Sequence, residues 1–251
     1  ELLSSLYKGT NPRLQHTSAF KRTTPPGCGS VLVRYSDEHE VLRRFEIEKN
    51  GIRFMRVGLP TSESLGEQCY HANMSAAEIY LNHLIDEENE FVVVDLTAGI
   101  DTLASGMFVS YDVIYIVVEP TLKSLKVYTD YLSIAQSTGI NAVIYPIANK
   151  VSGIEDLTYI EGVIGQEPIA VFPLSDYVKK MERGDSIPFQ EIESASLDQL
   201  RAIEAHIKSH SKDWEKFYSN LLFFHNKKAV KEPQLKLEEQ IDPDFNIKSV
   251  L

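Results

Sequence analysis

An acid and a glycine four residues apart, Asp95 and Gly99, follow a run of four apolar residues, Phe-Val-Val-Val. Such a run predicts that residues 91–95 form a fully buried strand of a parallel sheet. A carboxylate at the carboxyl end of that strand lies where open α/β sheets bind ligands, and it can hold Mg²⁺ through water. Gly99 then lets the backbone approach a phosphate closely. The alternative is that Asp95 is only a helix cap or a loop residue.

The pair Asn149-Lys150 follows a second apolar run, residues 142–148, which also predicts a strand. An asparagine amide both donates and accepts hydrogen bonds, and the aliphatic stem of a lysine can cover the plane of a base. A guanine site would need a carboxylate two residues after the lysine, and Ser152 stands there. The pair therefore favours adenine, although an isolated Asn-Lys pair is also common in plain turns.

Two other apolar runs, residues 114–118 and 169–172, end in acidic or turn-forming residues. Because parallel strands point the same way, we expect all these strand ends to lie on one edge of the sheet. The residues expected at this edge besides Asp95 are Glu119, Pro120, Asn149, Lys150, Pro173, Leu174 and Ser175.

Strands and helices must alternate along the chain to position these residues. Thr121 can cap a helix over residues 122–137, and helices are also expected at about 154–164 and 176–183. From residue 91 to 183 this order predicts a doubly wound, mostly parallel α/β sheet with helices on both faces.

The flanking regions carry other signals. Asn50-Gly51 favours a hairpin between residues 42–48 and 52–57. Residues 10–30 are expected to form an irregular loop and residues 31–35 a short strand, and His83, near the end of a helix over about 73–86, is expected at the surface. The last predicted elements are helices at 196–210 and 212–225 and a polar tail from residue 227, lying along the surface or partly ordered.

Three segments are expected: a loop-rich segment 1–30, an α/β domain 31–184, and C-terminal helices with a tail, 185–251. The chain has 251 residues, of which 43% are hydrophobic, as in ordinary globular proteins. A net charge of −11 argues against nucleic-acid and membrane binding, since both need a basic surface. The two cysteines form no disulfide framework, so a cytoplasmic protein is expected.

Three runs carry a resemblance to a known family: Val93-Val-Asp95-Leu-Thr-Ala-Gly99, Tyr115-Ile-Val-Val-Glu-Pro-Thr121 and Ala148-Asn-Lys-Val151. They resemble the ParA/MinD-type (SIMIBI) P-loop ATPases, above all the carbon monoxide dehydrogenase maturation (CooC-like) ATPases. The resemblance implies an ATP- and Mg²⁺-dependent homodimer that switches a client protein or a metal cofactor.

The resemblance also implies a role for each site residue. Asp95 would be the Walker B carboxylate for Mg²⁺, and Gly99 the switch II glycine that senses the γ-phosphate. Asn149 would bind adenine beside Lys150, with Glu119-Pro120 at the neighbouring strand end. Residues 173–175 would close over the base.

The loop Gly66-Glu-Gln-Cys-Tyr-His-Ala-Asn73 lies where the resembling proteins carry a Cys-x-Cys loop. One thiolate and one imidazole per subunit, Cys69 and His71, would make four ligands across a two-fold axis, a set that suits Zn²⁺. The alternative is a buried thiol beside a histidine that caps the following helix.

One part of the family pattern is missing, because no Gly-x-x-x-x-Gly-Lys-Ser/Thr motif occurs in the chain. Either the N-terminal part that holds this loop precedes the sequence, as the start at Glu1 favours, or the protein is a degenerate relative. The first case predicts an ATPase once the loop is supplied. The second predicts a non-catalytic interaction protein on the same fold.

Overall fold

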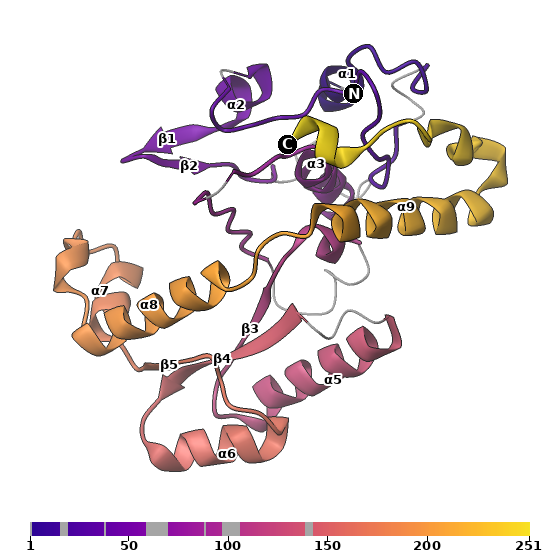
Figure 1. Cartoon of the computed structure of the whole chain (residues 1–251). Coiled ribbons are helices and arrows are strands. Elements are labelled where there is room, and N and C mark those ends of the chain that lie inside the picture. Colours follow the sequence, from indigo (N-terminus) through magenta and orange to yellow (C-terminus); the bar gives the residue numbers. More distant parts are fainter. Residues whose placement is uncertain are drawn as a thin grey trace. The chain divides into compact units, whose positions relative to one another are not determined.

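The computed structural model describes residues 2–15, 20–37, 39–58, 70–87, 89–96, 106–138 and 143–251. They form two compact units, each with its own secondary-structure elements (Figure 1). The first unit draws on residues 1–97, 104–110 and 213–251, and the second on residues 111–212.

The second unit is built on a parallel sheet in the order β3-β4-β5. Its strands are β3 (Ile114–Val118), β4 (Ile144–Val151) and β5 (Ala170–Pro173). Val118 lies beside Ala148, and Val151 lies beside Pro173. Three predicted strands and their parallel direction are therefore confirmed, and the unit has an α/β architecture.

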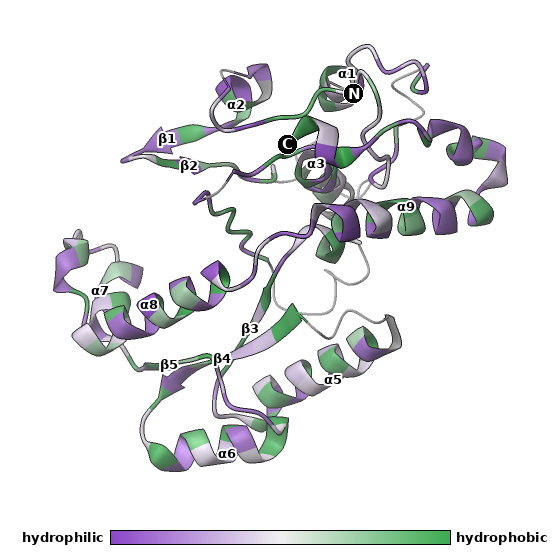
Figure 2. Cartoon of the chain, viewed as in Figure 1, coloured by the Kyte–Doolittle hydropathy of each residue, from purple (hydrophilic) through white to green (hydrophobic). Residues whose placement is uncertain are grey.

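Helices connect these strands and pack against them. Helix α5 contacts β3, α6 contacts β4 and α8 contacts β5. Figure 2 shows hydrophobic and hydrophilic residues alternating along α5, whose Leu125, Tyr128 and Ala135 are fully buried at helical spacing. The helices of this unit are α5 (Leu122–Thr138), α6 (Ile154–Ile164), α7 (Asp176–Glu182), the 3₁₀ turn η4 (Phe189–Glu191) and α8 (Ser194–Lys208).

Polar caps fix where the helices begin. Thr121 caps α5 as predicted, because its hydroxyl accepts a hydrogen bond from the Ser124 N–H at 3.3 Å. Ser175 caps α7 in the same way, through the Val178 N–H at 3.0 Å. Both caps lie in the turn after a strand, so the strand-to-helix turns at this edge of the sheet are held by side chains.

The predicted strand at residues 91–95 is wrong. These residues are assigned to no strand, and Phe91, Val92 and Val93 are 45%, 36% and 85% exposed. They belong to the first unit, whereas the parallel sheet lies in the second. An apolar run shows only that a segment favours burial, and strand formation also needs a neighbouring backbone to pair with, which no described segment supplies here. The described parallel sheet is consequently smaller than expected.

The first unit contains the predicted hairpin, formed by the antiparallel strands β1 (Ile47–Lys49) and β2 (Ile52–Phe54). Asn50 and Gly51 have φ of 55° and 75°, the left-handed values that a type I′ turn requires. Residues 40–45 are helical (α2, Glu40–Phe45), so the hairpin is shorter than predicted. The expected strand 31–35 is reduced to one bridge between Val33 and Leu84.

The tail is part of the core of the first unit. Helix α9 (Trp214–Lys231) runs beyond the predicted end at 225, and its Phe217 and Leu221 are buried in one cluster with Ile247. Trp214 packs against this cluster. The remaining elements are α1 (Leu2–Lys8), α3 (Tyr70–Asn82) and the 3₁₀ turns η2 (Met107–Ser110), η5 (Pro233–Leu235), η6 (Leu237–Gln240) and η7 (Ile247–Val250).

His83 was expected at the surface, and it is fully buried. Its ring stacks on Tyr7 with centroids 4.8 Å apart, and its Nδ1–H donates to the Ile79 carbonyl at 2.9 Å. The reason is a long-range contact: α1 packs against α3 and covers the end of that helix. Burial lowers the pKa of His83 to about 4.

Candidate functional site

The carboxyl ends of β3 and β4 meet through an ion pair. Glu119 directly follows β3, and Lys150 lies near the end of β4. The Lys150 ammonium donates to Glu119 Oε1 at 2.6 Å. This hydrogen bond raises the pKa of Lys150, and both side chains remain about half exposed. Two residues predicted from separate strand ends are therefore in contact.

The backbone of β4 is irregular where the Asn149-Lys150 pair stands. Lys150 has a φ of 59°, and the strand register shifts between Ala148 and Val151. The Asn149 side-chain oxygen accepts from the Lys150 N–H at 3.0 Å and supports this turn. Irregularities of this kind re-aim side chains near binding sites. Within the described part of the chain, the Asn149 amide nitrogen donates to no other group and is available to a ligand.

The turn after β3 holds Glu119 in place. Its backbone N–H donates to the Ser124 hydroxyl at 2.9 Å, and its carbonyl accepts from the Thr121 N–H at 2.7 Å. Pro120 lies between these contacts and fixes one backbone angle of the turn. Glu119 is thus presented from a constrained turn.

The end of β5 is tied to the start of α8. The Ser175 hydroxyl donates to Glu193 Oε2 at 2.8 Å, and Glu193 Oε1 accepts from the Tyr177 N–H at 3.0 Å. The Tyr177 N–H, with further donors that include Ser175, lowers the pKa of Glu193. Pro173 is the last residue of β5, and Leu174 after it is 61% exposed. Sequence reasoning missed Glu193, since it lies 18 residues from Ser175 and no local pattern marks it.

Asp95 belongs to the first unit, whereas the strand ends that hold Glu119 and Lys150 belong to the second. Its side chain is exposed, and it forms no hydrogen bond or ion pair with any described residue. Gly99 and Cys69 lie outside the described residues, and His71 lies in α3. Within the described ranges, no three or more histidine, cysteine, aspartate or glutamate side chains gather as a metal site.

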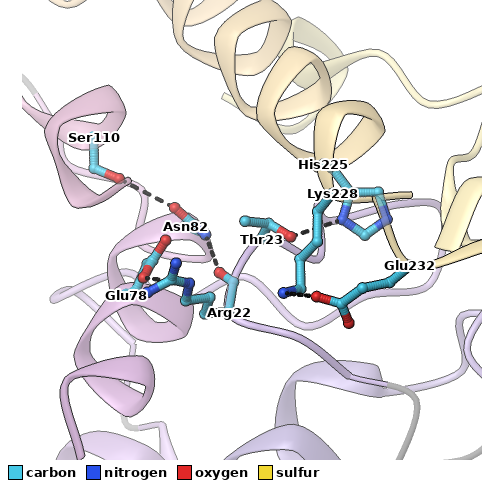
Figure 3. A network of polar contacts seen from close by, with 8 residues as sticks. All are labelled: Arg22, Thr23, Glu78, Asn82, Ser110, His225, Lys228 and Glu232. Carbon is cyan, nitrogen blue, oxygen red and sulfur yellow. Dashed lines mark hydrogen bonds and ion pairs between the residues drawn. The ribbon is translucent and has the colours of Figure 1, made fainter. Parts of the chain in front are cut away.

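A second polar cluster, which the sequence did not predict, lies inside the first unit around Glu78 (Figure 3). Asn82 donates to the Arg22 carbonyl at 2.9 Å and accepts from the Ser110 hydroxyl at 3.1 Å. Nearby, the Thr23 hydroxyl lies 3.1 Å from His225 Nδ1. His225 Nε2–H donates to the Leu237 carbonyl, which leaves Nδ1 as the acceptor. The cluster joins α3, η2, α9 and the loop at residues 20–24.

Glu78 is the member of this cluster with the least complete hydrogen bonding. It is 2% exposed, its Oε2 has no hydrogen-bond partner, and the Arg22 guanidinium is 3.8 Å away. Burial raises its pKa to about 8, so the carboxyl is mostly protonated at neutral pH. The sequence does contain a signal for it, because Glu78 falls at helical spacing between the apolar Met74 and Leu81.

Three curated proteins are similar to parts of this chain. Carbon monoxide dehydrogenase accessory protein CooC of Rhodospirillum rubrum is 26% identical over 48% of this chain and 45% of its own length. Uncharacterized ATP-binding protein MJ0084 of Methanocaldococcus jannaschii is 27% identical over 55% of this chain and 54% of its own. Uncharacterized ATP-binding protein MJ0823 of the same organism is 31% identical over 54% of this chain and 55% of its own.

The chain thus spans about half the length of the curated relatives it matches. No family model matches the sequence, and no solved structure matches the fold. None of the helices in the described ranges is both long and apolar enough to cross a bilayer. The three similarities support kinship with P-loop ATPase-like proteins.

Proposed function

We propose that this chain is the nucleotide-binding part of an ATP-hydrolysing switch protein of the ParA/MinD/CooC class, with a doubly wound P-loop fold in the complete protein. The observation that carries the proposal is the meeting of Asn149, Lys150 and Glu119 at the carboxyl ends of adjacent parallel strands. Ligands of α/β sheets bind at this edge. The names of the similar archaeal proteins support ATP as the ligand.

In this proposal the strand ends recognise the adenine. The free amide nitrogen of Asn149 donates to the base, while the Lys150 stem covers the plane of the base and Glu119 holds its ammonium in place. Residues 173–175 close over the base, in a position fixed by the Ser175–Glu193 hydrogen bond. The described contacts thus leave the Asn149 amide nitrogen accessible and hold Lys150 and Ser175 in place.

The proposal assigns the phosphate end of the nucleotide to Asp95 and Gly99. Asp95 is an exposed carboxylate without an ion-pair partner among the described residues, which fits Mg²⁺, since this ion is bound through one or two carboxylates and several waters. Bound Mg²⁺ would neutralise charge on the phosphates. Gly99 would sense whether the γ-phosphate is bound, and the resulting change would be transmitted to a dimer partner or a client.

The test uses the full-length gene product as its native cell makes it, because the 251 residues contain no Gly-x-x-x-x-Gly-Lys-Ser/Thr motif. Mg²⁺-ATP and Mg²⁺-GTP are titrated against it by calorimetry. We expect saturable binding that favours ATP and weakens at least tenfold in Asn149→Ala and Asp95→Ala. Lys179→Ala, an exposed change on α7, should leave the affinity unchanged and serves as the control.

The second candidate is a non-catalytic interaction protein, favoured by the missing phosphate-loop motif. The same titration separates the two functions. A folded full-length protein that binds neither Mg²⁺-ATP nor Mg²⁺-GTP would rule out the switch and leave the interaction protein.

Two further parts of the proposal concern assembly. We propose a homodimer that forms with ATP and separates after hydrolysis, and light scattering with ATP, ADP and no nucleotide measures it. We also propose that Cys69 and His71 bind Zn²⁺ across the two-fold axis. Metal analysis of the dimer should then find zinc that Cys69→Ser removes.

A further inference from the structure

Four aromatic residues of the second unit form a cluster that the proposed nucleotide site does not use. Tyr115 and Tyr145 are register partners near the amino-terminal ends of β3 and β4, away from the strand ends that hold Lys150. His206 lies in the last turn of α8, and His210 follows four residues later. The two imidazole centroids are 4.5 Å apart, and Tyr145 lies 4.5 Å from the ring of His206.

The hydrogen bonds of His210 determine its tautomer. Its Nδ1 lies 2.8 Å from the His206 carbonyl oxygen, which can only accept. Nδ1 therefore carries the proton, and Nε2 presents a lone pair. The Tyr145 hydroxyl lies 3.1 Å from this Nε2 and donates to it. His210 thus has the tautomer that binds metal ions through Nε2.

His206 can adopt the same state. Its Nδ1 lies 2.7 Å from the Tyr115 hydroxyl, which can accept a hydrogen bond as well as donate one. With Nδ1–H donating to Tyr115, the lone pair of Nε2 is open, and Nε2 has no partner among the described groups. Neutral imidazole is the form that binds a metal.

From this cluster we propose a second site in the chain, which binds a divalent transition-metal ion of the zinc class. The ligands are Nε2 of His206, Nε2 of His210 and the Tyr145 oxygen, with water in the fourth position. The ion takes the place of the hydroxyl hydrogen that Tyr145 donates to His210 Nε2, and that proton leaves to solvent. Tyr115 orients His206 through Nδ1, as second-layer partners of metal-bound histidines do.

One ligand-to-ligand separation and the donor types fit this ion. Two ligands on one tetrahedral ion with bonds of about 2.0–2.1 Å lie roughly 3.3 Å apart. The 3.1 Å between His210 Nε2 and the Tyr145 oxygen is close to that value. Two imidazole nitrogens select Zn²⁺ or Cu²⁺ over Mg²⁺ and Ca²⁺, which prefer oxygen ligands. The site contains only two histidines, so it depends on the tyrosine and on water to complete the coordination.

The test is a calorimetric titration of metal-stripped protein with ZnCl₂, without nucleotide. All variants carry Cys69→Ser and His71→Gln, which remove the other candidate zinc site, so that failure of the proposed function does not affect the result. We expect one equivalent of Zn²⁺ per chain. His206→Gln and His210→Gln should each weaken binding at least tenfold, and the double variant should show no saturable binding. His39→Gln, in the first unit, is the histidine control and should bind as the parent does.

Co²⁺ absorption gives a readout that does not depend on affinity. The parent should show the visible bands of a tetrahedral ion, and Tyr145→Phe, which keeps the ring but removes the oxygen, should change them. Circular dichroism checks that each variant is folded. Saturable zinc binding that survives in the His206→Gln/His210→Gln double variant would overturn the proposal, as would a folded parent that binds no zinc.

Discussion

Lys150 and Glu119 lie 31 residues apart in the sequence and are joined by a 2.6 Å ion pair that links the end of β4 to the turn after β3. The contact exists because the two strands are parallel and adjacent, so their carboxyl ends coincide. It positions a flexible lysine stem beside Asn149 at the edge where α/β sheets bind ligands. The pair therefore serves more to place Lys150 than to stabilise the fold.

The first prediction separates these two effects in Lys150→Met. Both partners are about half exposed, so solvent screens the ion pair and it contributes little to the free energy of unfolding. We expect almost unchanged stability, together with at least fivefold weaker ATP binding by the full-length protein. Urea unfolding and nucleotide titration measure the two quantities, with Lys179→Met as control. Equal ATP affinity in Lys150→Met and Lys179→Met would show that Lys150 does not contribute to ATP binding.

Ser175→Ala is expected to lower the stability of the second unit. The hydroxyl caps α7 through the Val178 N–H and also donates to Glu193, so two contacts are lost at once. Loss of an N-cap of this kind costs about 1 kcal/mol. Thermal unfolding should show a lower Tm, and Ser175→Thr, which keeps a hydroxyl, should recover most of the difference. A Tm equal to that of the parent would show that the cap contributes nothing.

Glu78→Gln is expected to change how stability depends on pH. The folded protein holds the proton of Glu78 up to a pKa of about 8, whereas the unfolded chain releases it near 4.5. Folding therefore takes up a proton between these values, and wild-type stability falls as pH rises from about 5 to 8. The loss is on the order of 2 to 4 kcal/mol, at about 1.4 kcal/mol per pKa unit.

Glutamine mimics the protonated carboxyl and does not titrate, so the variant should lose less stability over this range. Urea unfolding at pH 5, 6, 7 and 8 measures the difference between the two proteins. Parallel curves would mean that Glu78 is already ionised in the folded state at pH 5.

His83→Phe tests the acid side of the pH range. The pKa of buried His83 is about 4 when folded and about 6.5 when unfolded. Its stabilising contribution is therefore complete above pH 6.5 and is lost as pH falls towards 4, by up to roughly 3 kcal/mol. Phenylalanine keeps a ring against Tyr7 and cannot be protonated, so the variant should lose less stability between pH 6.5 and 4.

Unfolding measured at these two pH values, with His39→Phe as a control, gives the size of the effect. If the acid-induced loss is the same in His83→Phe as in the wild type, the buried imidazole does not account for it.

Gly9→Ala is expected to destabilise the first unit strongly. Gly9 has a φ of 52°, and an added Cβ would lie 2.4 Å from the Gly29 carbonyl oxygen. The combined strain and clash should cost at least about 2 kcal/mol. Gly51→Ala is the matched control, because Gly51 also has a positive φ, 75°, but no atom lies within 4 Å of the added Cβ. Its cost should be about 1 kcal/mol, from the backbone angle alone. Similar losses in the two variants would show that the contact at Gly29 is not tight.

The sequence by itself determined the local elements of this protein. Residues 114–118 are mostly β-branched and apolar, Thr121 offers a capping hydroxyl, and Asn50-Gly51 encodes a tight turn. Each signal acts over a few residues, and the structure confirms each one. The convergence of Glu119 and Lys150 was also predictable, because it needs only the parallel direction of two strands.

Tertiary structure decided which segments pair as strands and which side chains are buried. Residues 91–95 have the composition of a strand, yet no described segment pairs with them, and Phe91, Val92 and Val93 stay exposed. Glu78 and His83 have the residue types of a surface, yet both are buried. Helix α1 covers His83, and the residues around Arg22, Gly106 and Ser110 enclose Glu78. Burial and strand pairing are set by contacts between residues far apart in the chain, and apolar patterning within one segment does not contain that information.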